Sequence, residues 1–107
     1  MANILARRRP DNLWYWYSTG PNGEELMHSN VGRRDRASVE LDLRVLRLLV
    51  AKPGIVAVEV HQSPRVGDWR SHLSVIGEHD YEATSTDWHD RRCDAQSAAE
   101  MTVAALR

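Results

Sequence analysis

Short stretches in which apolar and polar residues alternate occur along the chain, and they predict β-strands. The clearest is Val56–Gln62, where valine occupies every second position between alanine, glutamate and histidine. By analogy with this stretch, we expect Asn3–Arg8 to form a first strand. Aromatic and β-branched residues predict further strands over 13–18, 24–30, 69–76 and 80–86.

Turn residues join four of these strands into two hairpins. Pro21-Asn22-Gly23 predicts a turn because proline presets φ and an Asn-Gly pair tolerates positive φ. A second turn is expected at Gly77-Glu78-His79. The segment 63–68, which contains Pro64 and Gly67, is expected to be a loop.

Two longer segments have the period of a helix. The first begins at a cap on or near Asp35 and continues to about Lys52, where Pro53-Gly54 ends it. The second begins at Asp87 or Asp90 and continues to the last residues of the sequence. The predicted order is therefore three strands and a helix, repeated once.

The two halves also share residues in the same order, at a spacing that grows only from 54 to 58 positions. Pro10, Trp14, Ser18, Ser29, Arg33-Arg34, Ala37, Val45 and Leu48 recur as Pro64, Trp69, Ser74, Ser85, Arg91-Arg92, Ala95, Val103 and Leu106. A repeat of this size decides the architecture. We predict a single α+β domain, 1–107, made of two βββα units at about 1–54 and 55–107. Its antiparallel sheet has five or six strands, with both helices on one face.

The first helix is apolar on two nearly opposite sides. One stripe is Val39, Leu43, Leu46 and Val50, and the other is Leu41, Val45, Leu48 and Leu49. A helix of this kind needs cover on both sides. The sheet covers one side, and the other is covered either by a second copy in a homodimer or by the second helix. The second helix has a face of small residues suited to close approach: Ala95, Ala98, Ala99, Thr102 and Leu106.

The composition of the chain indicates which kinds of partner and which cellular compartment suit it. The chain has 107 residues and a formal net charge of −1, which argues against a strong chain-wide attraction to nucleic acid or anionic lipid. Thirteen of its fourteen basic residues are arginine, a bias that genome base composition or bidentate anion contacts can explain. A single cysteine, Cys93, excludes an internal disulfide and fits a reducing compartment. With no apolar run of membrane-spanning length and no apolar stretch before Arg7, we expect a cytoplasmic protein that does not enter membranes.

The first half resembles the YegP-type family of small domains. The residues that carry the resemblance are Trp14-Tyr15-Trp16-Tyr17, Asn22-Gly23-Glu24, Ser29, Arg36-Ala37 and Glu40. Members commonly contain two tandem copies, and their fold implies a mixed sheet backed by helices. The second copy here departs from the pattern, with Gly77-Glu78-His79 at the turn and Ser71 in place of a second tryptophan. The family has no established activity, so the resemblance implies a fold and no function.

A second resemblance is to double-stranded-RNA-binding domains. From the first helix onward the predicted order is α-β-β-β-α, and Arg91-Arg92 precedes an alanine pair, Ala98-Ala99, in the last helix. Such domains contact phosphates by shape and charge. Asp90 and Asp94 flank the arginine pair and depart from that pattern. The alternative function is therefore nucleic-acid binding through arginines near the two helix starts, which an internal twofold would present together: Arg33, Arg34, Arg36, Arg91 and Arg92.

Histidine and cysteine do not form a convincing chemical site. The histidines are His28, His61, His72, His79 and His89. His89 and Cys93 have the spacing of a helical ligand pair, but a zinc site needs two further ligands that no sequence rule supplies. The same pair lacks the orienting third group of a nucleophilic triad. We therefore expect no metal, no cofactor and no enzymatic activity.

The aromatic strand is the best candidate binding surface. Alternation places Trp14 and Trp16 on one face and Leu13, Tyr15 and Tyr17 on the other, so one pair of aromatic residues remains for a partner if helices cover a single face. The matching strand adds Trp69, Arg70 and His72. Tyrosine and tryptophan are frequent anchors of interfaces. We predict a non-enzymatic macromolecular-binding module with a protein partner, and its small size without a catalytic signature also suits a phage or mobile-element inhibitor.

Overall fold

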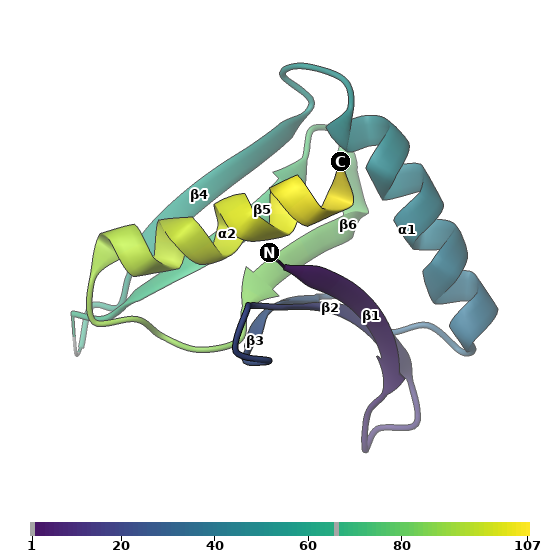
Figure 1. Ribbon diagram of the computed structural model, residues 1–107, viewed down its shortest axis with the longest axis horizontal. Helices are drawn as coiled ribbons and strands as arrows, with labels where there is room; N and C mark the ends of the chain where they lie inside the picture. Colours follow the sequence, from purple (N-terminus) through teal and green to yellow (C-terminus); the bar gives the residue numbers. More distant parts are fainter. Residues whose placement is uncertain (1, 66) are drawn as a thin grey trace.

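The computed structural model describes residues 2–65 and 67–107, without the side chain of His79, so Val66 of the expected loop lies outside the described residues. It contains one six-stranded antiparallel sheet and two helices (Figure 1). In chain order the elements are β1 Asn3–Arg8, β2 Trp14–Thr19, β3 Glu25–Ser29, α1 Arg36–Val50, β4 Val56–Gln62, β5 Trp69–Val75, β6 Glu78–Ser85 and α2 Arg92–Leu106. The predicted α+β class, the strand Asn3–Arg8 and the order of elements are confirmed.

The strands lie in the order β1-β2-β3-β6-β5-β4, and each pairs with its neighbours in antiparallel fashion. The two halves meet in the middle of the sheet, where Met27 pairs with Ser85 and Ser29 pairs with Ala83. β1 and β4, the first strand of each half, therefore form the two outer edges. The turn predicted at Asn22-Gly23 is present, and Gly23 has a φ of 80°, which glycine adopts without strain.

Corresponding backbone contacts recur in the two halves. Trp14 forms an isolated bridge to Arg33, and Trp69 forms one to His89. These contacts make His89, and not Arg91, the counterpart of Arg33. The helices agree with this shorter spacing, because Asp35 and Arg91 occupy the cap positions before them. The spacing of 58 used above to align the arginine pairs is therefore wrong by two residues, and descent of the halves from one duplicated unit stays a prediction.

The two helices begin in different ways. Asp35 caps α1 as predicted, and its side chain accepts a hydrogen bond of 2.8 Å from the backbone of Ser38. The prediction that α2 begins at Asp87 or Asp90 is wrong, because the helix starts only after Arg91, which makes no capping bond. The backbone of His89 is held by hydrogen bonds to Trp69, and these keep the chain extended up to the helix.

Both helices pack against the same face of the sheet and share one core. Its large members are Trp16, Met27, Leu46, Leu73 and Leu106, together with Ala98 and Ala99 of α2. The alanines allow α2 to approach the strands closely, as its small-residue face predicted. In the described part of the chain, neither helix is long and apolar enough to cross a membrane.

Two residues of the second apolar stripe of α1 are left open, although Leu49 of the same stripe packs against the core. Leu41 is 59% exposed and Leu48 is 69% exposed, whereas Leu46 on the other side is fully buried. The two helices meet by their C-terminal ends, where Arg47 donates hydrogen bonds to the carbonyls of Ala105 (3.0 Å) and Leu106 (3.3 Å) (Figure 1). Packing of the helices on each other therefore does not explain the exposed part of the stripe, Leu41 and Leu48, and a homodimer through α1 stays a prediction.

Candidate binding surface on the open sheet face

The side of the sheet opposite the helices, called the open face below, carries the candidate site. Trp16 and Ser18 of β2 are buried under the helices, so the alternating Tyr15 and Tyr17 point to the open face. His28 of β3, Thr84 of β6 and His72 of β5 lie across from Tyr17 in register and share this face.

The tryptophans of β2 and β5 lie on the helix side. Trp16 is only 2% exposed and belongs to the core, so its prediction as a binding residue is wrong. Trp14 is partly buried against the same core, and Trp69 has the guanidinium of Arg92 at 5.9 Å from its ring. The predicted alternation of Trp14 and Trp16 with the tyrosines is right, and the helices leave the tyrosines open.

Arg7 of β1 and Arg9, which follows this strand, lie over the two tyrosines. The guanidinium of Arg7 is 4.5 Å from the ring centre of Tyr17, and that of Arg9 is 6.0 Å from the ring centre of Tyr15. Tyr15 donates a hydrogen bond of 2.6 Å to Asp11. This bond lowers the pKa of the Asp11 carboxyl and raises the pKa of the Tyr15 hydroxyl. The rings and cations therefore form a ready-made cation–π surface.

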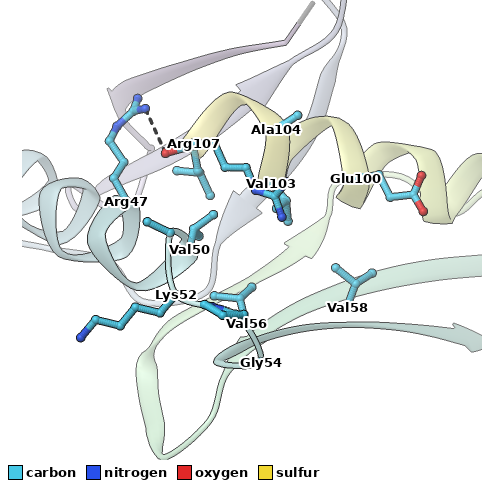
Figure 2. Close-up of a pocket in the computed structure, with 13 residues that line it drawn as sticks. Arg47, Val50, Lys52, Gly54, Val56, Val58, Glu100, Val103, Ala104 and Arg107 are labelled. Carbon is cyan, nitrogen blue, oxygen red and sulfur yellow. Dashed lines mark hydrogen bonds between the residues drawn. The ribbon is translucent and has the colours of Figure 1, made fainter.

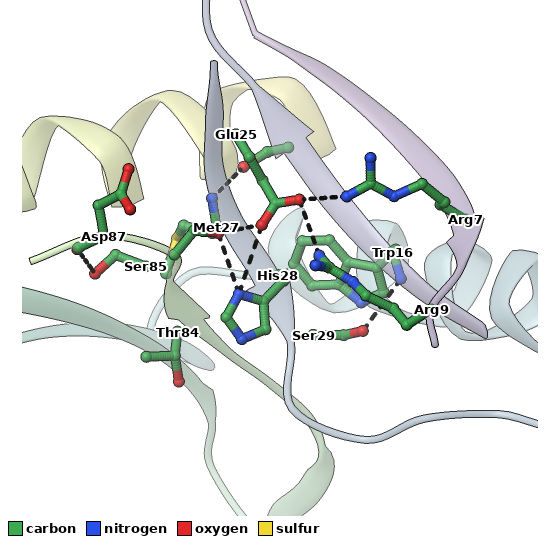
Figure 3. Close-up of polar contacts among 12 residues, drawn as sticks. Arg7, Arg9, Trp16, Glu25, Met27, His28, Ser29, Thr84, Ser85 and Asp87 are labelled. Carbon is green, nitrogen blue, oxygen red and sulfur yellow. Dashed lines mark hydrogen bonds and ion pairs between the residues drawn. The ribbon is translucent and has the colours of Figure 1, made fainter. Parts of the chain in front are cut away.

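Glu25 holds both arginines in place (Figure 3). Its Oε1 accepts hydrogen bonds from Arg7 (3.0 Å) and Arg9 (2.9 Å), and its Oε2 accepts one from the Thr86 hydroxyl. Burial acts to raise the pKa of the Glu25 carboxyl, but the bonds from Thr86 and Arg9 outweigh it, and the net shift is downward. Glu25 therefore stays ionised at neutral pH and links β1, β3 and the end of β6.

The protonation of His28 follows from the same network. Its Nδ1 lies 3.1 Å from the Thr86 oxygen. The Thr86 hydroxyl donates its proton to Glu25, so it can only accept a hydrogen bond from His28. Nδ1 of His28 therefore carries a proton, and Nε2 of the neutral ring is left as an acceptor. Burial lowers the pKa of His28 and favours this neutral form.

A cavity of about 510 Å³ opens beside these residues, lined by Arg9, Asp11, Tyr15, His28, Asn30 and Thr84. The hydroxyl of Thr84 donates a hydrogen bond of 2.8 Å to the side-chain oxygen of Asn30, which fixes the orientation of the side-chain amide. The cavity combines a cation, an aromatic ring and polar groups, the mixture found where ligands and side chains of partners are held.

The second half extends this surface. Arg70 and His72 lie on the open face, because they alternate with Ser71 and Leu73, which are buried under the helices. The guanidinium of Arg70 stacks at 4.3 Å on the ring of Trp88, a residue that sequence analysis did not select. His72 makes an edge-to-face contact with His61 at 5.7 Å between ring centres.

Sequence analysis also missed Glu25, Arg9 and Thr86. Arg9 lies 16 positions before Glu25, and Thr86 lies 61 positions after it, so the three residues form no sequence motif. The only local signal was the run of arginines before Pro10, which carries no information about its acceptor.

The arginines of the nucleic-acid alternative are not brought together. The starts of α1 and α2 lie at opposite sides of the molecule in Figure 1, because the helices converge by their C-terminal ends. Acidic neighbours already pair with three of these side chains: Arg33 with Asp42 (2.6 Å), Arg36 with Glu40 (3.0 Å) and Arg91 with Asp94 (3.2 Å). Arg34 is exposed, and Arg92 lies over Trp69.

His89 and Cys93 do not form the ligand pair that their spacing suggested. His89 lies in the bridge to Trp69, outside α2, so the two residues do not share a helical face. Among the described residues, no group of three or more histidine, cysteine, aspartate or glutamate side chains is placed to hold a metal ion.

Comparison with known proteins bears on the fold alone. No family model matches the chain, and no curated protein matches it. The solution NMR structure of YegP from E. coli, a protein of unknown function, is similar with a TM-score of 0.71 and 13% sequence identity. The match covers 98% of this chain and 85% of YegP. The chain therefore has the fold of YegP, as the resemblance of its first half implied.

Proposed function

We propose that this protein is a non-enzymatic binding module that holds a protein partner on the open face. The observation that carries the proposal is the pair Tyr15 and Tyr17, lying under Arg9 and Arg7 on the side of the sheet that neither helix covers. Tyrosine and arginine are among the residues that contribute most to protein interfaces, because they combine apolar area with directed hydrogen bonds.

The surface is ordered before a partner arrives. Glu25 restrains both arginines, and Asp11 restrains Tyr15. Side chains that are already fixed lose little conformational entropy on binding, which favours affinity. A matching partner surface offers hydrogen-bond acceptors to the guanidinium edges and an apolar side chain for the cavity beside Tyr15.

Two other functions relate to this proposal in different ways. Inhibition of a host system by a phage or mobile element is a special case, in which the bound partner is a host protein. Nucleic-acid binding is a separate alternative, and the separation of the helix starts and the ion pairs of Arg33 and Arg36 count against it. Phosphate contacts would give binding a steep dependence on salt concentration, whereas protein recognition gives a shallow one.

The test compares proteins crosslinked to wild type and to two variants in native cells, identified by mass spectrometry. Arg7→Ala/Tyr17→Ala removes one cation–π pair of the open face. Arg44→Ala/Ile76→Ala is the matched control, because it removes one cation and one exposed apolar side chain elsewhere. We expect a partner protein that the control retains and the open-face variant loses. With that partner purified, the affinity should fall at least about tenfold, equivalent to about 1.4 kcal/mol.

Equal recovery of every protein by both variants would refute the proposal. Capture of duplex RNA or DNA that the open-face variant retains, and that moderate salt releases, would favour the nucleic-acid alternative.

A further inference from the structure

The outer edge of β4 has backbone groups without a strand partner among the described residues, because β4 pairs only with β5. At the two ends of the strand, Ile55 and Ser63 are hydrogen-bonded toward the β5 side, to Ile76 (3.0 Å) and Asp68 (2.7 Å). Alternate residues of a strand direct their N–H and C=O groups to opposite sides. The even-numbered valines, 56, 58 and 60, therefore direct theirs outward.

A groove runs beside this edge, between β4 and α2. Two adjoining cavities form it, one of about 830 Å³ (Figure 2) and one of about 550 Å³, and Val58 and Glu100 line both. Val56 and Val103 add to its apolar wall. Val58 is 37% exposed in the middle of the edge. An exposed apolar edge strand is a template for pairing with another chain.

Charge is distributed unevenly along the groove. Arg92 lies at the end near His61, and Arg47 and Arg107 lie at the end near Gly54. Glu100 is shared by both cavities. Lys52 also lines the larger cavity, and Glu59, which is paired with His61, also lines the smaller one. The groove therefore suits a ligand with a carboxylate at each end and apolar groups between them.

We infer that the β4 edge binds an extended acidic segment of a partner protein as an added antiparallel strand. Every second side chain of such a strand points toward the helix side and enters the groove, while its backbone pairs with the three valines. Apolar side chains occupy the middle, and carboxylates meet Arg92 at one end and Arg47 with Arg107 at the other. This site is separate from the open face, so the inference goes beyond the function proposed above.

A second copy of the chain suits the groove less well. In a pair of β4 strands, the second copy offers only its valines to the helix side. Its one carboxylate on β4, Glu59, alternates with these valines and points to the opposite face. The arginines at the two ends of the groove would then receive no anionic partner.

The first test uses the synthetic peptide acetyl-Glu-Thr-Val-Thr-Val-Thr-Glu-amide, in which glutamate and valine share one face of an extended strand. We expect it to bind and to shift the backbone amide signals of β4 and α2 in NMR spectra. N-methylation of its two valines should weaken binding at least about tenfold, whereas N-methylation of its threonines should not, because the valine N–H groups face β4 and the threonine N–H groups point away from it. No binding, or equal effects of the two methylations, would overturn the inference.

Variants of the protein supply the second test. Val58→Pro removes an outward N–H group and leaves the β4–β5 ladder intact, so we expect a folded protein that no longer binds the peptide. Arg92→Glu should also abolish binding, and a peptide with lysine at the matching end should restore it. Binding that survives Arg92→Glu unchanged would overturn the inference.

The two proposed surfaces can fail independently. Arg7→Ala/Tyr17→Ala should bind the peptide like wild type, because it alters only the open face. A peptide-free protein that is a dimer, and that Val58→Pro converts to a monomer, would overturn the inference in favour of pairing between two copies.

Discussion

The hydroxyl oxygens of Ser18 and Thr102 lie 2.7 Å apart in the core, joining β2 of the first half to α2 of the second. Thr102 donates its proton to the carbonyl of Ala98 (2.8 Å), so Ser18 is the donor to Thr102. Ser18 in turn accepts the backbone N–H of Met27 (3.1 Å). A continuous chain of buried hydrogen bonds therefore connects two strands to the helix.

Breaking this chain should destabilise the protein. Thr102→Val leaves the Ser18 donor buried without an acceptor, and we expect a loss of about 1–3 kcal/mol in the free energy of unfolding, measured by urea denaturation. Ser18→Ala should cost a similar amount. The double variant should lose less than the sum of the two, because each single change already breaks the shared bond. Ser97→Ala, on the exposed side of α2, is the control and should change stability by less than about 0.5 kcal/mol.

Two neighbouring buried serines should behave in opposite ways. Ser85 accepts the backbone N–H of Ser71 (3.0 Å), so Ser85→Ala leaves that group unpaired and should cost about 1–3 kcal/mol. The Ser71 hydroxyl is buried and has no hydrogen-bond partner in the described structure. Ser71→Ala should therefore be neutral or stabilising by about 1 kcal/mol in the same urea assay. A large loss of stability in Ser71→Ala would contradict this account of the core.

His28 should make stability depend on pH. Burial lowers its pKa below the ordinary value of 6.5, repulsion from Arg9 and Arg70 acts in the same direction, and Glu25 opposes them. The unfolded chain therefore binds this proton more readily than the folded one, and the free energy of unfolding should fall as the pH drops below about 6.5. Glu25 affects stability at a more acidic pH. Because the pKa of its carboxyl is lower in the folded protein than the ordinary value of 4.5, Glu25 stabilises the fold above pH 4.5 and loses this effect as the pH falls below that value.

Urea denaturation across this pH range provides the measurement. His28→Gln should flatten the loss of stability that begins below about pH 6.5, the ordinary pKa of this side chain. His61→Gln is the matched control, because its ring is 58% exposed and lies outside the Glu25 network. An unaltered profile in His28→Gln would assign the pH dependence to other groups.

The exposed stripe of α1 predicts self-association. Leu41 and Leu48 lie on the side of the helix that the sheet and α2 leave open. We expect a dimer in light scattering at high micromolar concentration and a monomer for Leu41→Ser/Leu48→Ser, because apolar burial drives such contacts. A wild-type monomer under these conditions would rule out the homodimer.

Most elements of the fold are predictable from the sequence because their signals are local. Asp35 caps the helix that follows it, Gly23 supplies the positive φ of a turn, and alternating valines mark β4. The start of α2 was not predictable in this way. A backbone bridge between His89 and Trp69, twenty residues apart, overrides the local preference of aspartate for a cap.

The candidate site also has a part that the sequence predicts and a part that only packing decides. Alternation along β2 separates Tyr15 and Tyr17 from Trp14 and Trp16, but it does not decide which pair the helices cover. Packing decides this, because the bulk of Trp16 fills the core under the helices. The Glu25 network, too, exists only where β1, β3 and β6 lie side by side.

The sequence by itself determined the strands, the first helix and the opposite orientation of the two aromatic pairs, since these depend on residues a few positions apart. Only the tertiary structure decided which face is open, where the helix starts lie and which acid holds Arg7 and Arg9. Those properties depend on contacts between distant segments, whose partners are selected by packing of the whole sheet.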